Sequence, residues 1–380
     1  MSCFDEQKLG DLLTFQRGFD ITKNEQKEGD VPIVSSSGIS SFHNQSKARA
    51  PGVVIGRKGS LGTVHYLSDD YWPHDTTLWV KDFKGNEPRF IYYFLQTLHL
   101  ENFDVGSSNP TLNRNHLHKI KVLFPVKQQK KIAATVSAYD DLIDNNRRRI
   151  ELLEQMAEEL YREWFVRFRF PGYQQVKFDK GIPNTWQKKR FGEFCGLKRG
   201  YDLPDAQIED GSFPIIASTS IKAFHNQFKV EPPVICTGRS GSLGTVLFVN
   251  ERAWPLNTAL YVQHFFGNSP YLIYFTLKNM GLAAFNSGAG VPSLNRNHLN
   301  GISIAVPDNP LQQEFDKHIS VLFEKKEKLV EAGSSLQKLR DALLIRLISG
   351  KLPVDQLDIQ FPPSMREAAE APTGCSPCLT

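Results

Sequence analysis

Apolar residues alternate at intervals of four and three positions along two long stretches of this chain. In the first stretch these residues are Ile132, Val136, Tyr139, Ile143, Ile150, Leu153, Ala157, Leu160 and Trp164, with Asn146 as the polar residue in step. No proline or glycine occurs between Val126 and Phe170. The pattern predicts a helix of about 40 residues with a narrow apolar seam of the coiled-coil type.

The second stretch repeats this spacing less regularly. Its apolar residues are Phe315, Ile319, Leu322, Leu329, Leu336, Leu343 and Leu347, whereas Lys326, Gly333 and Arg340 also fall in step. Two seams of one period suit each other as partners, and Asn146 would then fix their register at some cost in stability. The alternative, in which each helix packs only on its own domain, stays open.

The segments before these two helices are copies of one unit. FHNQ begins at residues 42 and 224, GR(K/S)GSLGTV at 56 and 238, and LNRNHL at 112 and 294, so each pair is 182 positions apart. The match runs without a gap from Leu9–Pro125 onto Phe191–Pro307. We therefore expect a duplicated α+β domain of short strands, with one amphipathic helix per copy near residues 89–100 and 271–282.

These patterns divide the chain into five parts. We expect domains at 1–125 and 173–307, long helices at 126–172 and 308–357, and a disordered tail at 358–380. The net charge of +4 permits an acidic partner without requiring one. The chain has no apolar run long enough to cross a membrane, its beginning lacks a signal-peptide core, and its 5 cysteines are scattered. We expect a cytoplasmic protein.

Sequence signatures of common catalytic sites are missing. GRKGSLG fits neither the Walker pattern nor GxGxxG, and the chain has no HExxH and no GxSxG. The Asn/Asp-Pro-Pro-aromatic tetrapeptide of amino-methyltransferases is also missing. Cys375 and Cys378 form a single CxxC, which offers too few ligands for zinc. We expect no catalytic residue, no metal and no cofactor bound by this chain.

Repeated polar positions are the candidates for ligand contact. The Gly-Arg-x-Gly-Ser-x-Gly turn lets backbone amides approach an anion, while arginine and asparagine side chains suit phosphates and base edges. The DNA-binding candidates are Arg17, His43, Asn44, Arg57, Lys58, Ser60, Asn113, Arg114 and Asn115 in the first copy, and Lys198, Arg199, Lys222, His225, Asn226, Arg239, Ser240, Ser242, Asn295, Arg296 and Asn297 in the second. Maintenance of the fold is an equal alternative for each motif, because Asn-Arg-Asn can cap a helix and Gly-Ser-Leu-Gly can close a hairpin.

Discrimination between sequences should lie where the copies differ. Such positions are Ser40/Lys222, Arg49/Glu231, Lys58/Ser240, His74/Leu256 and residues 107–109 against 289–291. Identity between the copies marks what the fold needs in both, so the differing positions are the candidates for discrimination between sequences.

The whole arrangement resembles the specificity (S) subunit of a type I restriction–modification system. Its most specific motifs are LLEQMAEELYREWF in the first long helix and LRDALLIRLISGKL near the end of the second, and the likeness covers about residues 9–357. The resemblance implies two target-recognition domains, each for one half of a bipartite DNA site, and an antiparallel coiled coil between them. A slip of two positions, which aligns Gln128-Gln129 with Gln312-Gln313, is a small departure.

The same resemblance implies partners and cofactors outside this chain. The partners are double-stranded DNA, adenine-N6 methyltransferase (M) subunits that use S-adenosylmethionine, and restriction (R) subunits that use ATP and Mg, with no membrane involved. The S subunit itself performs no chemistry in the family. Duplicated domains about a pseudo-twofold axis predict similar, inverted half-sites about one helical turn apart. The alternative is a coiled-coil protein–protein scaffold with two β-rich modules, which would lack salt-dependent DNA binding.

Overall fold

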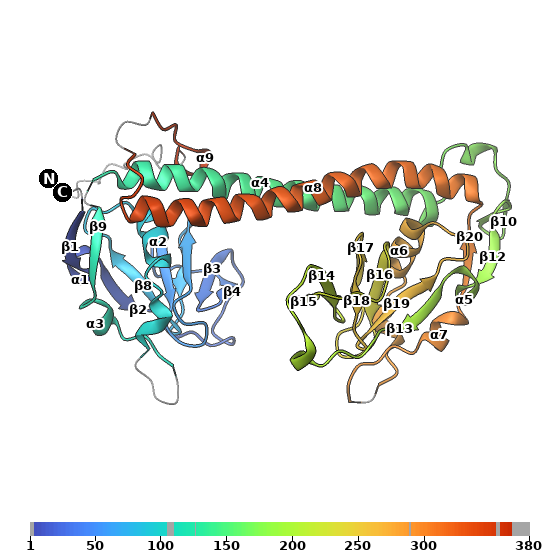
Figure 1. The fold of residues 1–380 in the computed structure, drawn as a ribbon, viewed down its shortest axis with the longest axis horizontal. Helices are drawn as coiled ribbons and strands as arrows, with labels where there is room; N and C mark the ends of the chain where they lie inside the picture. Colours follow the sequence, from blue (N-terminus) through green and yellow to red (C-terminus); the bar gives the residue numbers. More distant parts are fainter. Residues whose placement is uncertain (1–3, 105–109, 126, 289, 355–357, 367–380) are drawn as a thin grey trace. The chain divides into compact units, whose positions relative to one another are not determined.

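The computed structural model describes residues 4–366 except 105–109, 126, 289 and 355–357 (Figure 1). The chain divides into two compact units, unit 1 with Met1–Arg147 and Val330–Thr380, and unit 2 with Arg148–Leu329. The division crosses both long helices, α4 (Gln129–Tyr161) and α8 (Asn309–Ile348). Each unit therefore contains one globular domain and a part of each helix.

The domain of unit 1 is built mainly from two small sheets. The four-stranded sheet has the order β2-β8-β5-β6 and is antiparallel throughout, and the three-stranded sheet has the order β4-β3-β7. An antiparallel pair, β1 with β9, joins the beginning of the domain to its end. The strands are β1 (Phe4–Lys8), β2 (Thr14–Arg17), β3 (Val31–Ser35), β4 (Gly38–His43), β5 (Gly52–Gly56), β6 (Val64–Leu67), β7 (Trp72–Pro73), β8 (Thr77–Asp82) and β9 (Lys121–Pro125).

The domain of unit 2 has the same sheets in the same order. They are β13-β19-β16-β17, β15-β14-β18 and β12-β20, and β10 with β11 forms an additional hairpin. The strands are β10 (Phe178–Asp179), β11 (Ile182–Pro183), β12 (Gln187–Arg190), β13 (Gly196–Arg199), β14 (Phe213–Ile216), β15 (Ile221–His225), β16 (Val234–Gly238), β17 (Val246–Val249), β18 (Trp254–Pro255), β19 (Ala259–His264) and β20 (Ser303–Val306). This equivalence confirms the duplicated α+β domain.

Short helices occupy corresponding places in the two domains. They are α1 (Leu9–Leu12), α2 (Pro88–Gln96) and α3 (Arg114–Leu117) in unit 1, and α5 (Phe191–Phe194), α6 (Pro270–Asn279) and α7 (Arg296–Asn300) in unit 2. Short 3₁₀ turns span Leu100–Phe103, Tyr173–Gln175, Asp205–Gln207 and Leu282–Phe285, and a π-helical turn, Arg162–Val166, follows α4. α2 and α6 are the two amphipathic helices that the sequence predicts.

Aromatic side chains join each domain to the long helices. In unit 1, Phe90 and Phe94 of α2 pack on Phe124 with ring centroids 5.6 and 5.0 Å apart, and this core continues into Ile132 and Val136 of α4. In unit 2, Phe315 of α8 packs within one core against Phe275 of α6 and Tyr161 at the end of α4. The long helices are thus part of the hydrophobic cores, whose burial stabilises both.

Every predicted seam residue is buried or partly covered. This holds for Ile132, Val136, Tyr139, Ile143, Asn146, Ile150, Leu153 and Leu160 of α4, and for Ile319, Leu322, Leu329, Leu336 and Leu343 of α8. The two cationic residues in step on α8 are paired: Arg340 Nη1 lies 2.7 Å from Asp140 Oδ1 in unit 1, and Lys326 Nζ lies 2.6 Å from Glu154 Oε1 in unit 2. α8 follows the second domain in sequence, yet Leu344 and Leu347 near its end belong to the core of unit 1. The alternative of each helix packing only on its own domain is therefore wrong.

Two equivalent glutamines fasten the domains to the helices. Gln129 Oε1 accepts from the Glu87 amide at 2.9 Å, and its Nε2 donates to Asn86 Oδ1 at 2.8 Å. Gln312 makes the same bonds to the Ser269 amide at 2.8 Å and to Asn268 Oδ1 at 3.1 Å. Gln129 thus corresponds to Gln312, so the expected slip of two positions is wrong. The slip is one position, because the hydrogen bonds and not the repeated Gln-Gln letters set the register.

The described part of the segment after α8 contains one short helix. Residues 358–366 include α9 (Pro363–Arg366), and the partly buried side chains of Ile359 and Met365 pack against the core of unit 1. The disorder expected for residues 358–380 stays a prediction. Residues 367–380, with Cys375 and Cys378, lie outside the described residues.

Candidate nucleic-acid interface

In unit 1, four candidate segments meet at one end of the four-stranded sheet. Arg17 ends β2, Arg57 directly follows β5, and residues 74–76 lead into β8, which lies between those strands. Because β8 is antiparallel to both neighbours, its beginning lies beside their ends. The Leu112 amide donates to the Arg57 carbonyl at 3.0 Å and brings in the segment after it. Residues 17–20, 56–63, 74–76 and 111–115 are named the strand-end edge of unit 1.

Unit 2 repeats the central backbone hydrogen bonds of this edge. The Arg57 amide donates to the Thr76 carbonyl at 2.9 Å, and the Arg239 amide donates to the Thr258 carbonyl at 2.8 Å. The Leu294 amide donates to the Arg239 carbonyl at 2.8 Å, as Leu112 does to Arg57. Residues 199–202, 238–245, 256–258 and 293–297 are named the strand-end edge of unit 2.

The glycine-rich turn of each edge depends on its glycines. A Cβ on Gly56 would lie 2.0 Å from the Ser60 carbonyl oxygen, and one on Gly238 would lie 2.1 Å from that of Ser242. Gly62 has a φ of +73° and Gly244 a φ of +99°, which other residues rarely adopt. The fold-maintenance alternative therefore accounts for these glycines. The turn leaves the side chains of Lys58, Ser60 and Ser242 exposed and that of Ser240 partly covered.

Arg57 and Arg239 are half-buried at the centre of the edges. Arg57 Nη1 donates to the Asp75 carbonyl at 3.3 Å, and Arg239 Nη1 donates to the Asn257 carbonyl at 3.0 Å. Partial burial, followed by the charge of Arg17, lowers the pKa of the Arg57 guanidinium. Arg57 remains a cation, since arginine does not lose its proton in proteins. One nitrogen of each guanidinium is held by the backbone and fixes the group at the surface.

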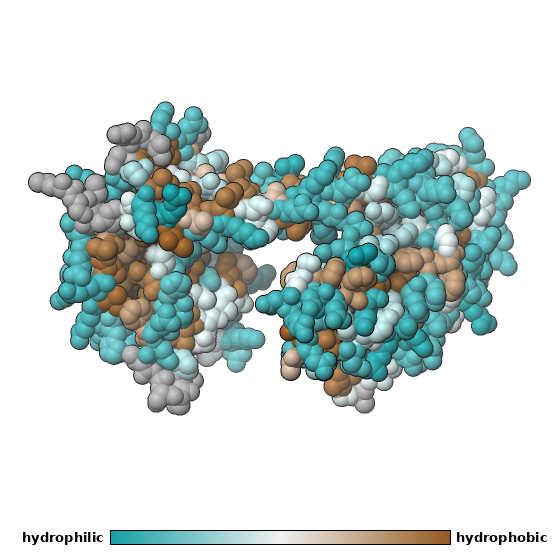
Figure 2. All heavy atoms as spheres, viewed as in Figure 1, coloured by the Kyte–Doolittle hydropathy of each residue, from teal (hydrophilic) through white to brown (hydrophobic). Residues whose placement is uncertain are grey.

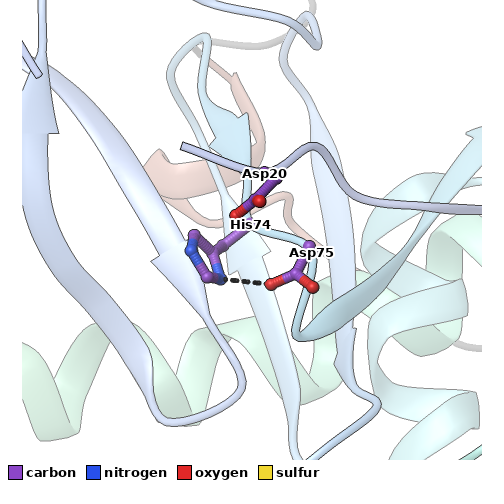
Figure 3. Close-up of side chains that lie close together, drawn as sticks. All are labelled: Asp20, His74 and Asp75. Carbon is purple, nitrogen blue, oxygen red and sulfur yellow. Dashed lines mark ion pairs between the residues drawn. The ribbon is translucent and has the colours of Figure 1, made fainter. Parts of the chain in front are cut away.

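A group of acidic and histidine side chains adjoins Arg17 in unit 1. Asp20, His74 and Asp75 point toward one another, with potential ligand atoms all within 4.8 Å (Figure 3). His74 Nδ1 lies 3.1 Å from Asp75 Oδ1, and Arg17 Nη2 donates to Asp75 Oδ2 at 2.9 Å. The three side chains have the donor types of a metal site, but guanidinium groups on the same side favour an ion pair over a metal cation.

The corresponding group in unit 2 is different. Leu256 replaces His74 and is buried, and Asn257 replaces Asp75. Arg199 Nη2 lies 3.5 Å from Asp202 Oδ1, which also accepts a hydrogen bond from Asn257 Nδ2. Lys198 is half-buried, and its Nζ lies 5.7 Å from the centroid of the Tyr201 ring. The two edges share a backbone frame but hold their exposed arginine in different ways.

Asn113 and Asn295 cap helices. Their side chains accept from the Asn115 amide at 2.9 Å and the Asn297 amide at 3.0 Å, at the beginnings of α3 and α7. This accounts for the first asparagine of each motif by fold maintenance. Arg114, Asn115, Arg296 and Asn297 are exposed on these helices, where they can reach a ligand, although Arg296 Nη1 also donates to the Leu197 carbonyl at 3.3 Å.

His118 follows α3 and is a structural histidine. Its Nε2 accepts from the Phe15 amide at 3.0 Å, so the ring must be unprotonated at that nitrogen. Burial, then the charges of Lys84 and Arg114, lowers the pKa of His118. Asn300 stands at this position in unit 2.

His43 and His225 are wrong as DNA-binding candidates. They are 5% and 3% exposed and contact the buried rings of Trp72 and Trp254. His43 Nδ1 accepts from the Lys27 amide at 2.9 Å, as His225 Nδ1 does from the Glu209 amide at 3.1 Å. Their repetition reflects the shared fold, because a buried side chain has no surface to offer to a base.

The remaining candidates lie on the β3–β4 and β14–β15 hairpins and not at the strand-end edges. Asn44, Asn226 and Lys222 are exposed there, with Asn226 bonded to Glu209 and Lys222 to Asp205. Of the differing positions, Ser40 and Arg49 are exposed, and Glu231 pairs with Arg252 at 2.9 Å. Residues 107–109 and 289 lie outside the described residues.

Sequence reasoning missed Asp75, Asn257 and the pair Asp20/Asp202. These residues became candidates only when the strand ends met in space. Asp75 directly follows His74, one of the positions where the copies differ, so the contrast of PHDTT with PLNTA was the available signal.

Among the residues that the structure covers, no helix is both long and apolar enough to cross a bilayer. Hydrophilic residues predominate on the visible face of unit 2 (Figure 2).

Known proteins with similar sequences are type I restriction–modification specificity subunits. The family model described as the type I restriction modification DNA specificity domain matches residues 1–155 and 183–332. The type I restriction enzyme MjaIX specificity subunit of Methanocaldococcus jannaschii is 27% identical over 72% of this chain and 71% of its own length. A Mycoplasma genitalium protein named as a type I specificity subunit is 24% identical over 87% of this chain and 91% of its own.

A solved structure shares the fold. The crystal structure of a type I restriction–modification S subunit from M. genitalium matches with a TM-score of 0.58 and 18% identity, over 91% of this chain and 96% of that one. The two matched segments contain the first and the second globular domain, which fits the duplication. The chain therefore belongs to the family of type I restriction–modification DNA specificity domains, whose members recognise DNA sequences.

Proposed function

We propose that each unit of this chain reads one half of a bipartite duplex DNA site through its strand-end edge. The observation that carries the proposal is the repetition of one edge, with the same arginines on the same backbone bonds, in two units of a DNA-specificity protein. Arg17, Lys58 and Arg114 are exposed in unit 1, as Arg199 and Arg296 are in unit 2. Such cations suit phosphates and guanine edges.

The chain directs chemistry that partner subunits perform. M subunits methylate adenine at N6 with S-adenosylmethionine, R subunits restrict DNA with ATP and Mg, and this chain binds none of these cofactors. The absence of catalytic motifs from the sequence supports this division of labour. The complex acts in the cytoplasm.

The two long helices form an antiparallel coiled coil that sets the spacing of the half-sites. Support comes from contacts inside each unit, Asp140 with Arg340 in unit 1 and Glu154 with Lys326 in unit 2. Residue numbers rise along α4 as those of their α8 partners fall, which is the order of an antiparallel pair. Inserting one heptad into α4 alone should disrupt assembly, whereas matched insertions in both helices should lengthen the spacer.

Graded-salt binding tests the reading surface. The full chain, assembled with its methyltransferase subunit, is measured on duplex DNA containing the methylated motif, which single-molecule sequencing of a methylating host identifies. Lys58→Gln with Arg114→Gln should lower affinity at least tenfold and reduce the salt slope by about 2, near one unit per lost phosphate contact. Lys81→Gln, an exposed cation at the other end of β8, is the matched control.

Affinity and salt slope of the double variant equal to those of the unsubstituted chain would refute the proposed surface. A complex with no bipartite motif would refute the function. One observation favours the scaffold alternative in that event: Ile39 and Phe42 of unit 1 and their counterparts Ile221 and Phe224 of unit 2 are 57%, 53%, 44% and 51% exposed. A repeated apolar pair of this kind suits a protein partner.

A further inference from the structure

The exposed arginines of the two edges stand on the same backbone but have different anchors. Arg17 and Arg199 are 54% and 52% exposed, and each ends a strand beside the entrance to the neighbouring one. In unit 1 the residue at that entrance is Asp75, and in unit 2 it is Asn257. A carboxylate in one unit and an amide in the other therefore lie near an arginine, a side chain suited to reading guanine.

In unit 1 the carboxylate fixes one side of the guanidinium. Arg17 Nη2 lies 2.9 Å from Asp75 Oδ2, and Asp75 is only 20% exposed. His74 Nδ1 lies 3.1 Å from the other carboxylate oxygen of Asp75 (Figure 3). A partly buried carboxylate with a neighbour at each oxygen has little freedom, so it restricts the orientation of the Arg17 guanidinium, whose side chain is still 54% exposed.

In unit 2 the arginine is held loosely. Its partner is Asp202, which is 73% exposed, and the distance from Arg199 Nη2 is 3.5 Å. Asp202 also accepts from Asn257, which competes with Arg199 for the same oxygen. Leu256, at the position of His74, is buried and cannot support a carboxylate.

We infer that positions 75 and 257, supported by 74 and 256, set a difference in base preference between the half-sites. Asp75 is a positioning residue that fixes Arg17 as a bidentate donor to guanine at one base pair. Asn257 leaves Arg199 free to turn to a phosphate or another base, so the equivalent base pair in the other half-site is read with less discrimination. This inference rests on the proposed function, and identifies the base contact within that surface.

Reciprocal exchange of the two residues tests the inference. Asp75→Asn and Asn257→Asp each give one unit the residue of the other, and Lys81→Gln, the residue of unit 2 at a position away from the edge, is the control. The complete complex with its methyltransferase subunit selects bound duplexes from pools in which one base pair of the motif at a time is randomised. Asp75→Asn should lower the preference for guanine about tenfold at one base pair of one half-site, and Asn257→Asp should raise it at the equivalent base pair of the other.

Equal loss of affinity at every base pair would indicate a structural role for Asp75 and overturn the inference, as would unchanged preferences in Asp75→Asn. If Asp75→Asn does not assemble, the double variant Leu256→His with Asn257→Asp, which gives unit 2 both residues of unit 1, decides, and an unchanged preference there overturns the inference. Failure of the unsubstituted complex to select a bipartite motif would instead refute the proposed function. If only the variant loses its preference for guanine while the unsubstituted complex still selects a bipartite motif, the proposed function stands.

Discussion

Removing the Gln312 side chain should weaken the attachment of the second domain to α8. Gln312 is 3% exposed and makes three hydrogen bonds: it accepts from the Ser269 amide at 2.8 Å, and donates to Asn268 Oδ1 at 3.1 Å and to the Pro307 carbonyl at 2.9 Å. Gln312→Ala removes these hydrogen bonds and leaves the Ser269 amide, Asn268 Oδ1 and the Pro307 carbonyl without them in a buried site. At about 1 kcal/mol for each bond, unit 2 should lose about 3 kcal/mol.

Gln129→Ala provides an internal comparison, because Gln129 makes the equivalent bonds to Glu87, Asn86 and Pro125. Gln129 is only partly buried, so water can replace the lost side chain. The loss in unit 1 should therefore be about 1 kcal/mol. Gln313→Ala, an exposed neighbour of Gln312, should change stability by less than about 0.5 kcal/mol.

Hydrogen–deuterium exchange with peptide resolution is the suitable assay, because it reports the free energy of opening for each unit separately. Peptides from α6 and β19 should exchange faster in Gln312→Ala, and peptides from α2 should do so in Gln129→Ala. Equal effects of Gln312→Ala and Gln313→Ala would refute the assignment of these bonds as the attachment. Equal losses in Gln129→Ala and Gln312→Ala would refute the argument from burial.

Three further perturbations have definite expected outcomes. The folded-state pKa of His118 lies below its ordinary value, so unit 1 should lose stability as pH falls below about 6.5. His118→Asn should abolish this loss in urea titrations at pH 7 and 5. An unchanged pH dependence in the variant would contradict the role of the ring as an acceptor. Asn113→Ala should lower the stability of unit 1 by about 1 kcal/mol, because the helix loses its cap. Asn113→Ser, which can still cap the helix, should retain most of the stability and the DNA affinity. A loss of affinity in the serine variant would favour a base contact over capping. Phe315→Ala removes a fully buried ring and should lower the stability of unit 2 by about 3–5 kcal/mol in the same titrations. Ile345→Ala, at a side chain that is 63% exposed, should change stability very little. Equal effects of the two variants would contradict the packing of α8 in that core.

Much of the architecture was predictable from the spacing of residues along the chain. The constant interval between FHNQ, GRxGSLGTV and LNRNHL revealed the duplication, and the four-three spacing located both helices and their covered seams. The candidate site was predictable only in part. Lys58 and Arg114 are exposed at the strand-end edge and Arg57 is half-buried there, but His43 and His225 are buried although their motif is repeated.

The sequence by itself determined the family, the repeat and the period of the helices, because each of these is a regularity along one dimension. Only the tertiary structure decided which repeated residues are structural and which face solvent. Burial and hydrogen bonding are set by neighbours distant in sequence: Trp72 covers His43, 29 positions away, and Asp75 lies against Arg17, 58 positions away. A repeated motif is compatible with helix capping and with DNA contact. Which of the two roles a side chain has is therefore decided only by its neighbours in the folded domain.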